Sequence, residues 1–317
     1  MSQPHWVKYT IYIGKSEDAK KAQEAKEEAA KAKMEISEEA PEIQGLKIAE
    51  DEEETKTYSK YFKIFNYEEG VKLLSIDISK DTELKKEYTK NAKKAMKISE
   101  NEDGLEYDDE GNIVAKSQNE YIEDLYKNNV INYLLVPEDY EVPAGLDKEY
   151  IVITVPSEKT FMASQEAISF MEELSCLDAI SLVGIDEDEL TSKDLKKAIE
   201  KEDALLAGNL EKPEYAKVVK DKSTLAVLPG QLLPEKIAKD ADNKDELKAE
   251  AEAKKAELEK LESRFTALGV PVIVDRSAQE EDELGQAEWI KVYGVLFGCE
   301  DEANEIFEKL VKEAEKE

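Results

Sequence analysis

The chain has 317 residues, enough for about two domains. It carries 75 Asp and Glu residues against 44 Lys and Arg residues, a formal net charge of -31 at pH 7. A surface this acidic repels polyanions, so we expect no nucleic-acid binding. No stretch approaches the roughly 18 apolar residues of a spanning helix, so no integral membrane segment is expected. No secretory signal is visible at the N-terminus, so the protein is either cytosolic or has lost a targeting segment.

The first half of the chain is polar, with short apolar runs that predict strands. The turn at Glu68-Glu69-Gly70 predicts a β-hairpin. The acidic run at 105–113 fits an Asp/Gly hairpin better than a calcium loop, because Ser117 stands where such a loop needs a bidentate Glu. The expected elements are a strand at 6–13, a charged helix at 17–34, an acidic linker at 35–57, strands at 61–66 and 71–76, helices at 81–98 and 117–128, and an edge-like strand at 133–137.

From residue 149 onward, short apolar runs alternate with helical segments. This alternation predicts an α/β fold, a parallel sheet with helices on both faces. A long C-terminal helix follows from about Gln286, with a break at Gly298. We therefore divide the chain into an N-terminal strand and charged helix or linker (1–56), a β-hairpin region with a polar insertion (57–148), and an α/β lobe with the C-terminal helix (149–317).

Catalytic and metal-binding patterns are missing from the sequence. There is no Gly-x-Ser-x-Gly, Walker or Gly-x-Gly-x-x-Gly motif. The single histidine, His5, provides neither a His-rich metal site nor a base near a nucleophile. Cys176 and Cys299 lie in apolar helical surroundings and are expected to be unreactive buried thiols. We expect no enzyme activity, no cofactor and no metal site.

Several runs resemble the iron-chelate and vitamin-B12-type substrate-binding proteins of ABC transporters, which are class III periplasmic binding proteins. The most specific is Asp275-Arg276-Ser277, followed by Leu284-Gly285 and then by Glu288-Trp289-Ile290-Lys291. The resemblance covers roughly residues 57–78 and 133–310. The chain departs from the family pattern in three places: Gln279 stands for Tyr, Asp282 for His and Gln286 for Arg.

The resemblance implies a solute-binding protein, or its first lobe, that delivers an iron-siderophore, haem or corrinoid-type ligand to an ABC transporter permease. It also implies an extracytoplasmic location, periplasmic or at the cell surface as a lipoprotein. In the family, the long helix leads to a second α/β lobe, which we do not find in this sequence. Glu214 lies near the position of the family's transporter-docking Glu, which is Ala216 here.

The candidate ligand site follows from topology. Parallel strands end at the same sheet edge, so the loops after Met162, Leu228 and Asp275 are expected to converge there. Arg276 could hold an anionic group, or it could form an ion pair with a neighbouring acid. Ser164 could open an anion-binding helix N-terminus or act only as a cap. The expected ligand-binding residues are Ser164, Gln165, Gln231, Arg276, Gln279 and Glu280.

Two other functions remain open. The first alternative is a non-transport interaction or scaffold protein that retains the α/β lobe without a functional pocket. The loss of the family's Tyr, His and Arg favours this alternative. A weaker one is an α/β hydrolase-like or transferase enzyme.

Overall fold

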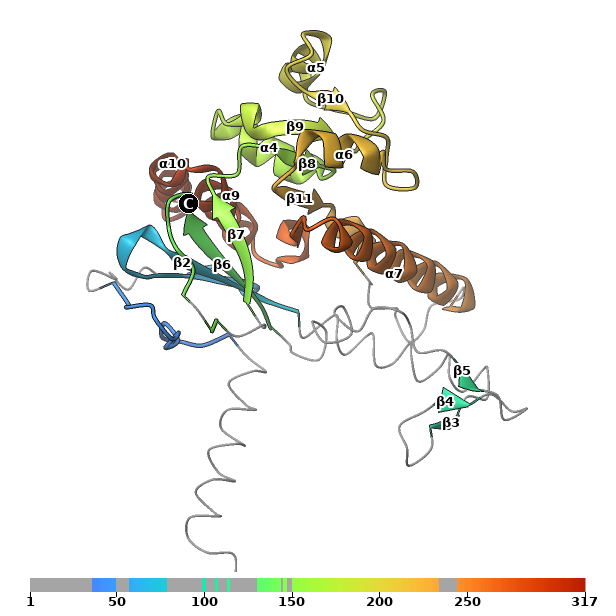
Figure 1. The fold of residues 1–317 in the computed structure, drawn as a ribbon. Coiled ribbons are helices and arrows are strands. Elements are labelled where there is room, and N and C mark those ends of the chain that lie inside the picture. Colours follow the sequence, from blue (N-terminus) through green and yellow to red (C-terminus); the bar gives the residue numbers. More distant parts are fainter. Residues whose placement is uncertain are drawn as a thin grey trace, which may run out of the picture.

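A computed structural model of the chain shows an α/β architecture built on two main sheets (Figure 1). The structure describes part of the chain, and the strand at 6–13 and the helices at 17–34, 81–98 and 117–128 that we predict lie outside this part. The described residues are 36–49, 57–78, 99–100, 106–107, 113–114, 130–143, 145–146, 150–233 and 244–316.

The larger sheet has five strands, and every neighbouring pair is parallel. Its order is β10-β9-β8-β11-β12. The strands are β8 (Thr160–Met162), β9 (Ile180–Val183), β10 (Leu205–Leu206), β11 (Leu225–Leu228) and β12 (Val272–Val274).

Helices cover both faces of this sheet, as the near-continuous apolar strands predict. In β11, Leu225 and Val227 belong to the core on one face, and Ala226 and Leu228 to the core on the other. Helices α4 and α5 pack on the first face, and α6 and α7 on the second. Their bounds are α4 (Gln165–Glu173), α5 (Lys193–Glu200), α6 (Tyr215–Asp221) and α7 (Lys244–Ala267).

The second sheet has four strands in the order β1-β2-β6-β7. The predicted hairpin is present, with its turn at Glu68–Gly70. The edge-like strand that we predict around 133–137 is instead an inner strand, paired on both sides. Its terminal Pro137 suggests an edge, but a proline at a strand end removes only one ladder donor. The strands are β1 (Phe62–Asn66), β2 (Lys72–Asp77), β6 (Val130–Pro137) and β7 (Tyr150–Val155).

Two shorter regions complete the description of the N-terminal half. Strands β3 (Ser99–Glu100), β4 (Glu106–Tyr107) and β5 (Ile113–Val114) form a small antiparallel sheet, which confirms a hairpin around residue 110. Residues 36–49 are more than a linker, because Ile43 is buried in a cluster on the four-stranded sheet. The Tyr67 hydroxyl also donates to the Pro41 carbonyl oxygen at 2.6 Å.

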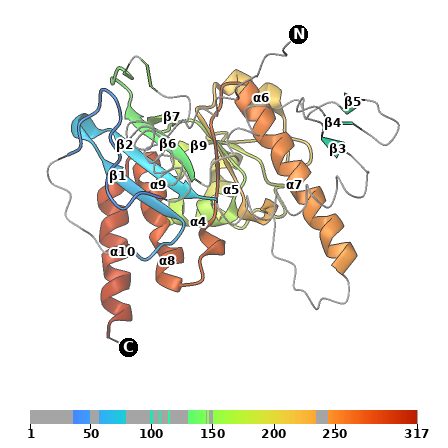
Figure 2. The same cartoon turned by 90° about the horizontal axis from the view of Figure 1, so that it is seen from below.

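The C-terminal helical segment runs beside the four-stranded sheet (Figure 2). It breaks at Gly298, whose positive φ of 74° ends one helix before the next begins. Phe62 packs on Trp289 and Phe170 on Tyr293, so this segment contacts β1 and α4 together. One continuous core therefore joins the two sheets. The helices are α8 (Glu283–Glu288), α9 (Ile290–Phe297) and α10 (Glu300–Ala314).

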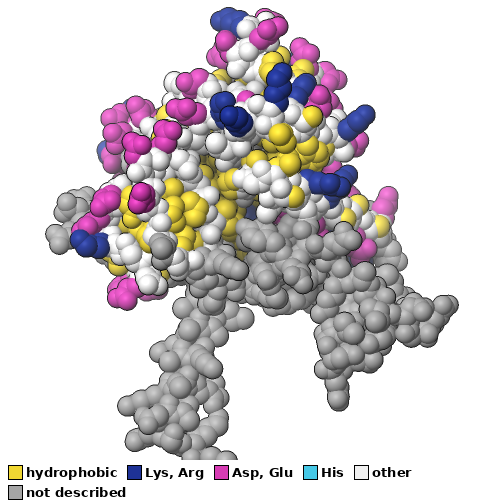
Figure 3. Space-filling view, in the orientation of Figure 1, with side chains coloured by type: hydrophobic (Ala, Val, Ile, Leu, Met, Phe, Trp, Pro, Cys, Tyr) yellow, Lys and Arg dark blue, Asp and Glu magenta, His cyan; other side chains and the backbone are white. Residues whose placement is uncertain are grey.

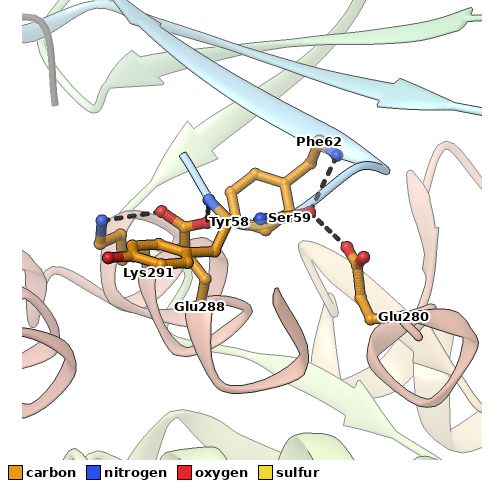
Figure 4. Close-up of polar contacts among 6 residues, drawn as sticks. All are labelled: Tyr58, Ser59, Phe62, Glu280, Glu288 and Lys291. Carbon is orange, nitrogen blue, oxygen red and sulfur yellow. Dashed lines mark hydrogen bonds and ion pairs between the residues drawn. The ribbon is translucent and has the colours of Figure 1, made fainter. Parts of the chain in front are cut away.

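Two glutamates hold the chain that leads into β1 (Figure 4). Glu288, which is only 2% exposed, accepts hydrogen bonds from the backbone N–H groups of Tyr58 and Ser59 at 2.7 Å each. Its other oxygen accepts from the Lys291 ammonium at 3.0 Å. Both oxygens of this buried carboxylate therefore have partners, as a charge removed from water requires.

Glu280 completes this clamp from the loop after β12. One of its oxygens accepts from the Ser59 hydroxyl and from the Trp289 indole N–H. The Lys60 backbone N–H also donates to it, at 3.2 Å. The clamp, Glu280 with Glu288, thus ties the segment before β1 to the carboxyl edge of the five-stranded sheet.

None of the helices in the described ranges is long and apolar enough to cross a membrane.

Replacing Glu288 with Gln should lower the free energy of unfolding by about 2–4 kcal/mol. The amide NH₂ must face either the two backbone donors or Lys291, so one donor–donor conflict is unavoidable. Chemical denaturation measures the loss. The control is Glu308→Gln, which removes an exposed pair with Lys312 and should cost less than about 0.5 kcal/mol. Equal losses in the two variants would show that the clamp does not stabilise the fold.

Candidate functional site

The five-stranded sheet reverses its strand order between β8 and β11. The chain runs outward from β8 through β9 to β10 and then returns to β11 and β12 on the other side of β8. All five carboxyl ends lie at one edge, and the connections leave the switch point in opposite directions. In open α/β sheets, such a point leaves a crevice beyond the strand ends where ligands bind.

A cleft of about 300 Å³ lies at this edge. It is lined by the loops that follow β8, β9, β10 and β11, so four loops that are separate in the sequence meet there. Ala163, Gly184, Ile185, Leu210 and Pro229 supply its less polar walls. The side chains with polar ends are the carboxylates Glu166, Asp186, Glu189 and Glu211 and the amides Gln165, Asn209 and Gln231.

The cleft is strongly acidic, because four carboxylates line it and no Lys, Arg or His side chain stands among its lining residues. The Asn209 amide donates to Asp186 at 2.8 Å. Gln165 bridges the start of α4 to the next loop, donating to the Glu189 carbonyl at 2.9 Å and accepting from the Thr191 hydroxyl at 2.8 Å. These contacts order the walls. The remaining carboxylate oxygens can accept hydrogen bonds from a ligand or balance positive charge on it.

The buried carboxylate of Asp275 organises the sheet edge beside the cleft. It is 2% exposed and lies directly after β12. One oxygen accepts from the Tyr293 hydroxyl at 2.6 Å and from the Ser164 hydroxyl at 3.2 Å. The other accepts from the Ser277 backbone N–H at 2.8 Å and from the Ser277 hydroxyl at 2.7 Å. Asp275 thereby joins α9, the start of α4 and the loop after β12.

Burial raises the pKa of Asp275, and the hydrogen bonds from Tyr293 and Ser277 partly oppose this effect. The nearby Glu166 carboxylate on the cleft wall raises this pKa further. Burial also raises the pKa of Tyr293 well above its ordinary value, and the Asp275 charge adds to the shift. The Tyr293 phenol therefore keeps its proton and remains a donor to Asp275.

Gly230 allows the loop after β11 to approach Asp275 closely. A Cβ atom at Gly230 would lie 2.3 Å from the Asp275 carbonyl oxygen, so no side chain fits between the two backbones. This approach places Gln231 at the cleft.

The structure brings together only some of the ligand-binding residues expected from the sequence. Gln165 and Gln231 line the cleft. Ser164 is fully buried, where it caps α4 by accepting from the Ala167 N–H and also donates to Asp275. These three residues come from the loops after β8 and β11.

The three expected residues from the loop after β12 do not line the cleft. Arg276 is 2% exposed, and its guanidinium donates to the Gln279 side-chain oxygen at 3.5 Å. Glu280 belongs to the clamp. Glu214 stands apart at the start of α6, where it pairs with Lys217 at 3.0 Å.

Five polar residues of the cleft were not predicted from the sequence, and one of them, Glu166, lies in the first turn of α4. Asp186 and Glu189 follow β9, and Asn209 and Glu211 follow β10. The strand-end rule that selects the loop after β8 applies equally to these two loops. The acidic run at 186–189 looks like ordinary solvated surface, which concealed it. Among the residues that the structure describes, no group of His, Cys, Asp and Glu side chains has the arrangement of a metal site.

Comparison with known proteins gives one curated relative and several distant structures, while no family model matches. The relative, from Methanocaldococcus jannaschii, is called an uncharacterized lipoprotein and is 26% identical over 239 residues. The match covers 70% of this chain and 50% of the relative, so the chain spans about half the length of that protein.

Among solved structures, the chain is similar to the molybdate periplasmic binding protein MolA of Haemophilus influenzae, with a TM-score of 0.34 and 9% identity over 49% of this chain and 46% of that one. A TroA-like periplasmic binding protein from Xylanimonas cellulosilytica gives 0.32 and 14% over 50% and 42%. An Fe3+-hydroxamate transport protein from Saccharomonospora viridis gives 0.31 and 16% over 50% and 48%. TM-scores this low do not establish a shared fold.

Replacing Asp275 with Asn should change the pH dependence of stability. Because burial raises the pKa of Asp275 above 3.8, the folded protein keeps a proton that the unfolded chain has lost. The free energy of unfolding of the wild type therefore falls as pH rises above 3.8 through the raised value. Asn cannot ionise, so the stability advantage of the wild type over Asp275→Asn should shrink, by about 1.4 kcal/mol for each pKa unit of the shift.

Chemical denaturation at about pH 4 and about pH 8 measures this difference. The control is Asp139→Asn, which makes the same substitution at an exposed position. An advantage of the wild type over Asp275→Asn that grows with pH would contradict the assigned direction of the Asp275 pKa.

Proposed function

We propose that the chain is a solute-binding protein, or the first lobe of one, that serves an ABC importer. The observation that carries the proposal is the cleft at the switch point of the parallel sheet, because ligands of open α/β sheets bind at that place. Its walls come from four loops on a rigid scaffold, which is typical of a preformed binding site.

Two further observations support binding rather than catalysis. The sequence resembles iron-chelate and vitamin-B12-type binding proteins along the run that ends in Glu288-Trp289-Ile290-Lys291. The cleft lining provides carboxylates and amides. It contains no serine or cysteine nucleophile and no histidine that could act as the general base beside one. The name of the curated relative, a lipoprotein, supports an extracytoplasmic location for this chain as well.

The acidic lining distinguishes among the three ligand classes that the resemblance implies. Haem carries two propionate groups, which the carboxylates of Glu166, Asp186, Glu189 and Glu211 would repel. A neutral or cationic metal chelate avoids this repulsion and can donate hydrogen bonds to the same oxygens. We therefore favour a ferric siderophore without net negative charge, or a corrinoid, over haem.

Glu214 is the proposed contact to the permease. It opens α6 on the surface and is free to exchange its exposed partner Lys217 for a basic residue of the transporter. A scaffold function without a ligand remains the alternative. It is favoured by the burial of Arg276 and by the engagement of Glu280 in the clamp, since neither side chain is presented to the cleft.

Thermal-shift and calorimetric titrations with a cationic ferric hydroxamate, cobalamin and haem test the ligand proposal. We expect the first or second to bind and haem to bind more weakly. Gln231→Ala should weaken the binding about five- to tenfold, or roughly 1–1.4 kcal/mol, by removing a hydrogen-bonding side chain from the cleft. Gln286→Ala is the matched control on the exposed side of α8 and should bind normally.

Glu211→Gln tests the charge argument separately. Neutralising this carboxylate should narrow the difference in affinity between haem and the cationic chelate. A well-folded protein that binds none of the three compounds would favour the scaffold alternative.

A further inference from the structure

We propose that binding of a cationic group at Glu166 is coupled, through the hydroxyl of Ser164, to the loss of a proton from Asp275. The inference rests on the proposed function, because it takes the cleft as the place where a ligand binds. Ser164 and Asp275 are buried and do not line the cleft. They are positioning residues that set how strongly the Glu166 carboxylate attracts positive charge, and they make the affinity for the ligand depend on pH.

A single hydroxyl hydrogen stands between two carboxylates. The Ser164 oxygen lies 3.1 Å from a Glu166 oxygen and 3.2 Å from an Asp275 oxygen. It also accepts a hydrogen bond from the Ala167 backbone N–H at 3.1 Å. Because a serine hydroxyl has one hydrogen, it can serve only one of the two acids at a time. When both acids are ionised, one of them therefore lacks this donor.

The two carboxylates lie in different surroundings, which decides which of them keeps the donor. Glu166 is exposed in the first turn of α4 and lines the cleft, where water or a ligand reaches it. Asp275 is buried, so an ionised Asp275 depends on hydrogen bonds from the protein. The ionised Asp275 thus holds the Ser164 hydrogen, and Glu166 takes its donors from the cleft.

A proton on Asp275 reverses the direction of the Ser164 hydroxyl. The Asp275 oxygen near Ser164 then donates to the Ser164 oxygen, and Ser164 donates to Glu166. Within the described ranges, the hydroxyls of Ser277 and Tyr293 have Asp275 as their only acceptor, so neither turns away without losing a hydrogen bond. Ser164 has a second acceptor in Glu166. The protonated state is therefore fully bonded only when Glu166 accepts from Ser164.

Positive charge at Glu166 favours the ionised state of Asp275. In that state Glu166 has given up the Ser164 hydrogen, and its oxygens can accept from the N–H or O–H groups of a ligand. The charge of the ligand also offsets the repulsion between the two carboxylates, which opposes ionisation of Asp275. The coupling is reciprocal: the ligand weakens proton binding by Asp275, and a rise in pH strengthens ligand binding by the same factor.

Helices α4 and α9 and the loop after β11 pack against Asp275. Helix α4 brings Glu166, and α9 brings Tyr293, which stays protonated because burial and the Asp275 charge raise its pKa well above the ordinary value. The loop after β11 approaches with Gly230, which has no side chain. Arg276, the next residue in the chain, donates within its own loop. The exchanged proton is therefore assigned to Asp275, whose pKa burial raises.

Charge variants of the cleft test the coupling without a ligand. NMR of carboxyl-labelled aspartate follows the titration, and Asp275→Asn identifies the Asp275 signal. Glu166→Lys places a fixed positive charge where the ligand charge would lie, so the pKa of Asp275 should fall below its wild-type value. Glu211→Lys makes the same charge change on another loop of the cleft and should lower this pKa much less. Equal falls in the two variants, or no fall in Glu166→Lys, would overturn the proposal.

Two further variants separate the hydrogen bond from the charge. Glu166→Gln should lower the pKa of Asp275 in the same direction by a smaller amount, and it serves as the test if a lysine at this position disturbs α4. With Ser164→Ala added, the effect of Glu166→Gln should shrink, because no hydroxyl then joins the two side chains. An undiminished effect would overturn the role of Ser164. Circular dichroism checks that each variant is folded.

Calorimetry with the cationic ferric hydroxamate tests the coupling to the ligand. Titrations in two buffers of different ionisation enthalpy, at the pH where Asp275 is half protonated, count the protons released on binding. The wild type should release more than Asp275→Asn, by up to about half a proton. Binding with equal proton release in both proteins would overturn the coupling and leave the proposed function standing. Absence of binding would count against the proposed function alone, and the charge variants would still decide the coupling.

Discussion

The buried carboxylate of Asp275 is the constraint on which the geometry of the site depends. It collects four hydrogen bonds from Ser164, Ser277 and Tyr293, and these residues belong to three separate segments of the chain. Removing such a group from water is costly unless its oxygens are fully bonded. Three segments, the start of α4, helix α9 and the loop after β12, must therefore be placed so that each donates a hydrogen bond to this one carboxylate. Gly230 adds the loop after β11, because its lack of a side chain lets that backbone pass against Asp275.

The position of the cleft follows from the strand order of the sheet, and its negative charge comes from the loops that line it. The switch between β8 and β11 opens the crevice, and the loops after β9 and β10 add Asp186, Glu189 and Glu211. In Figure 3, acidic side chains stand in groups at the left side and the top of the described face, with basic and hydrophobic side chains between them. The chain as a whole carries a net charge of -31, so the acidic cleft has the same sign as the protein. Charge therefore favours neutral or cationic ligands generally, and the specificity must come from the shape and the amide groups of the cleft.

The sequence alone predicts the parallel sheet, its two helical coverings, the hairpin and the break at Gly298, because these rest on local apolar patterns and on glycine. It could not predict which polar residues face the cleft. Arg276 and Glu280 follow a strand end, as site residues should, yet Arg276 is buried and Glu280 accepts a hydrogen bond from Ser59, which is distant in sequence. Glu280 accepts hydrogen bonds from Ser59, which is far away in the sequence, and from Trp289, which lies within an apolar helical stripe.

The run Glu288-Trp289-Ile290-Lys291, which carries the family resemblance, has a structural role here. Glu288 holds the chain before β1, and Trp289 packs on Phe62.

The most direct test of the central claim, that ligand binds in the cleft at the switch point, is amide hydrogen exchange. Exchange would be measured with and without whichever of the ferric hydroxamate, cobalamin or haem gives the largest thermal shift. We expect protection concentrated in four loops, at residues 163–166, 184–189, 209–211 and 229–231. Residues 283–291, which carry the clamp and the family-like run, should be unchanged. Protection centred on 276–291, with no change in the four loops, would show that the ligand does not bind in the cleft and would place it by the loop after β12 and α8.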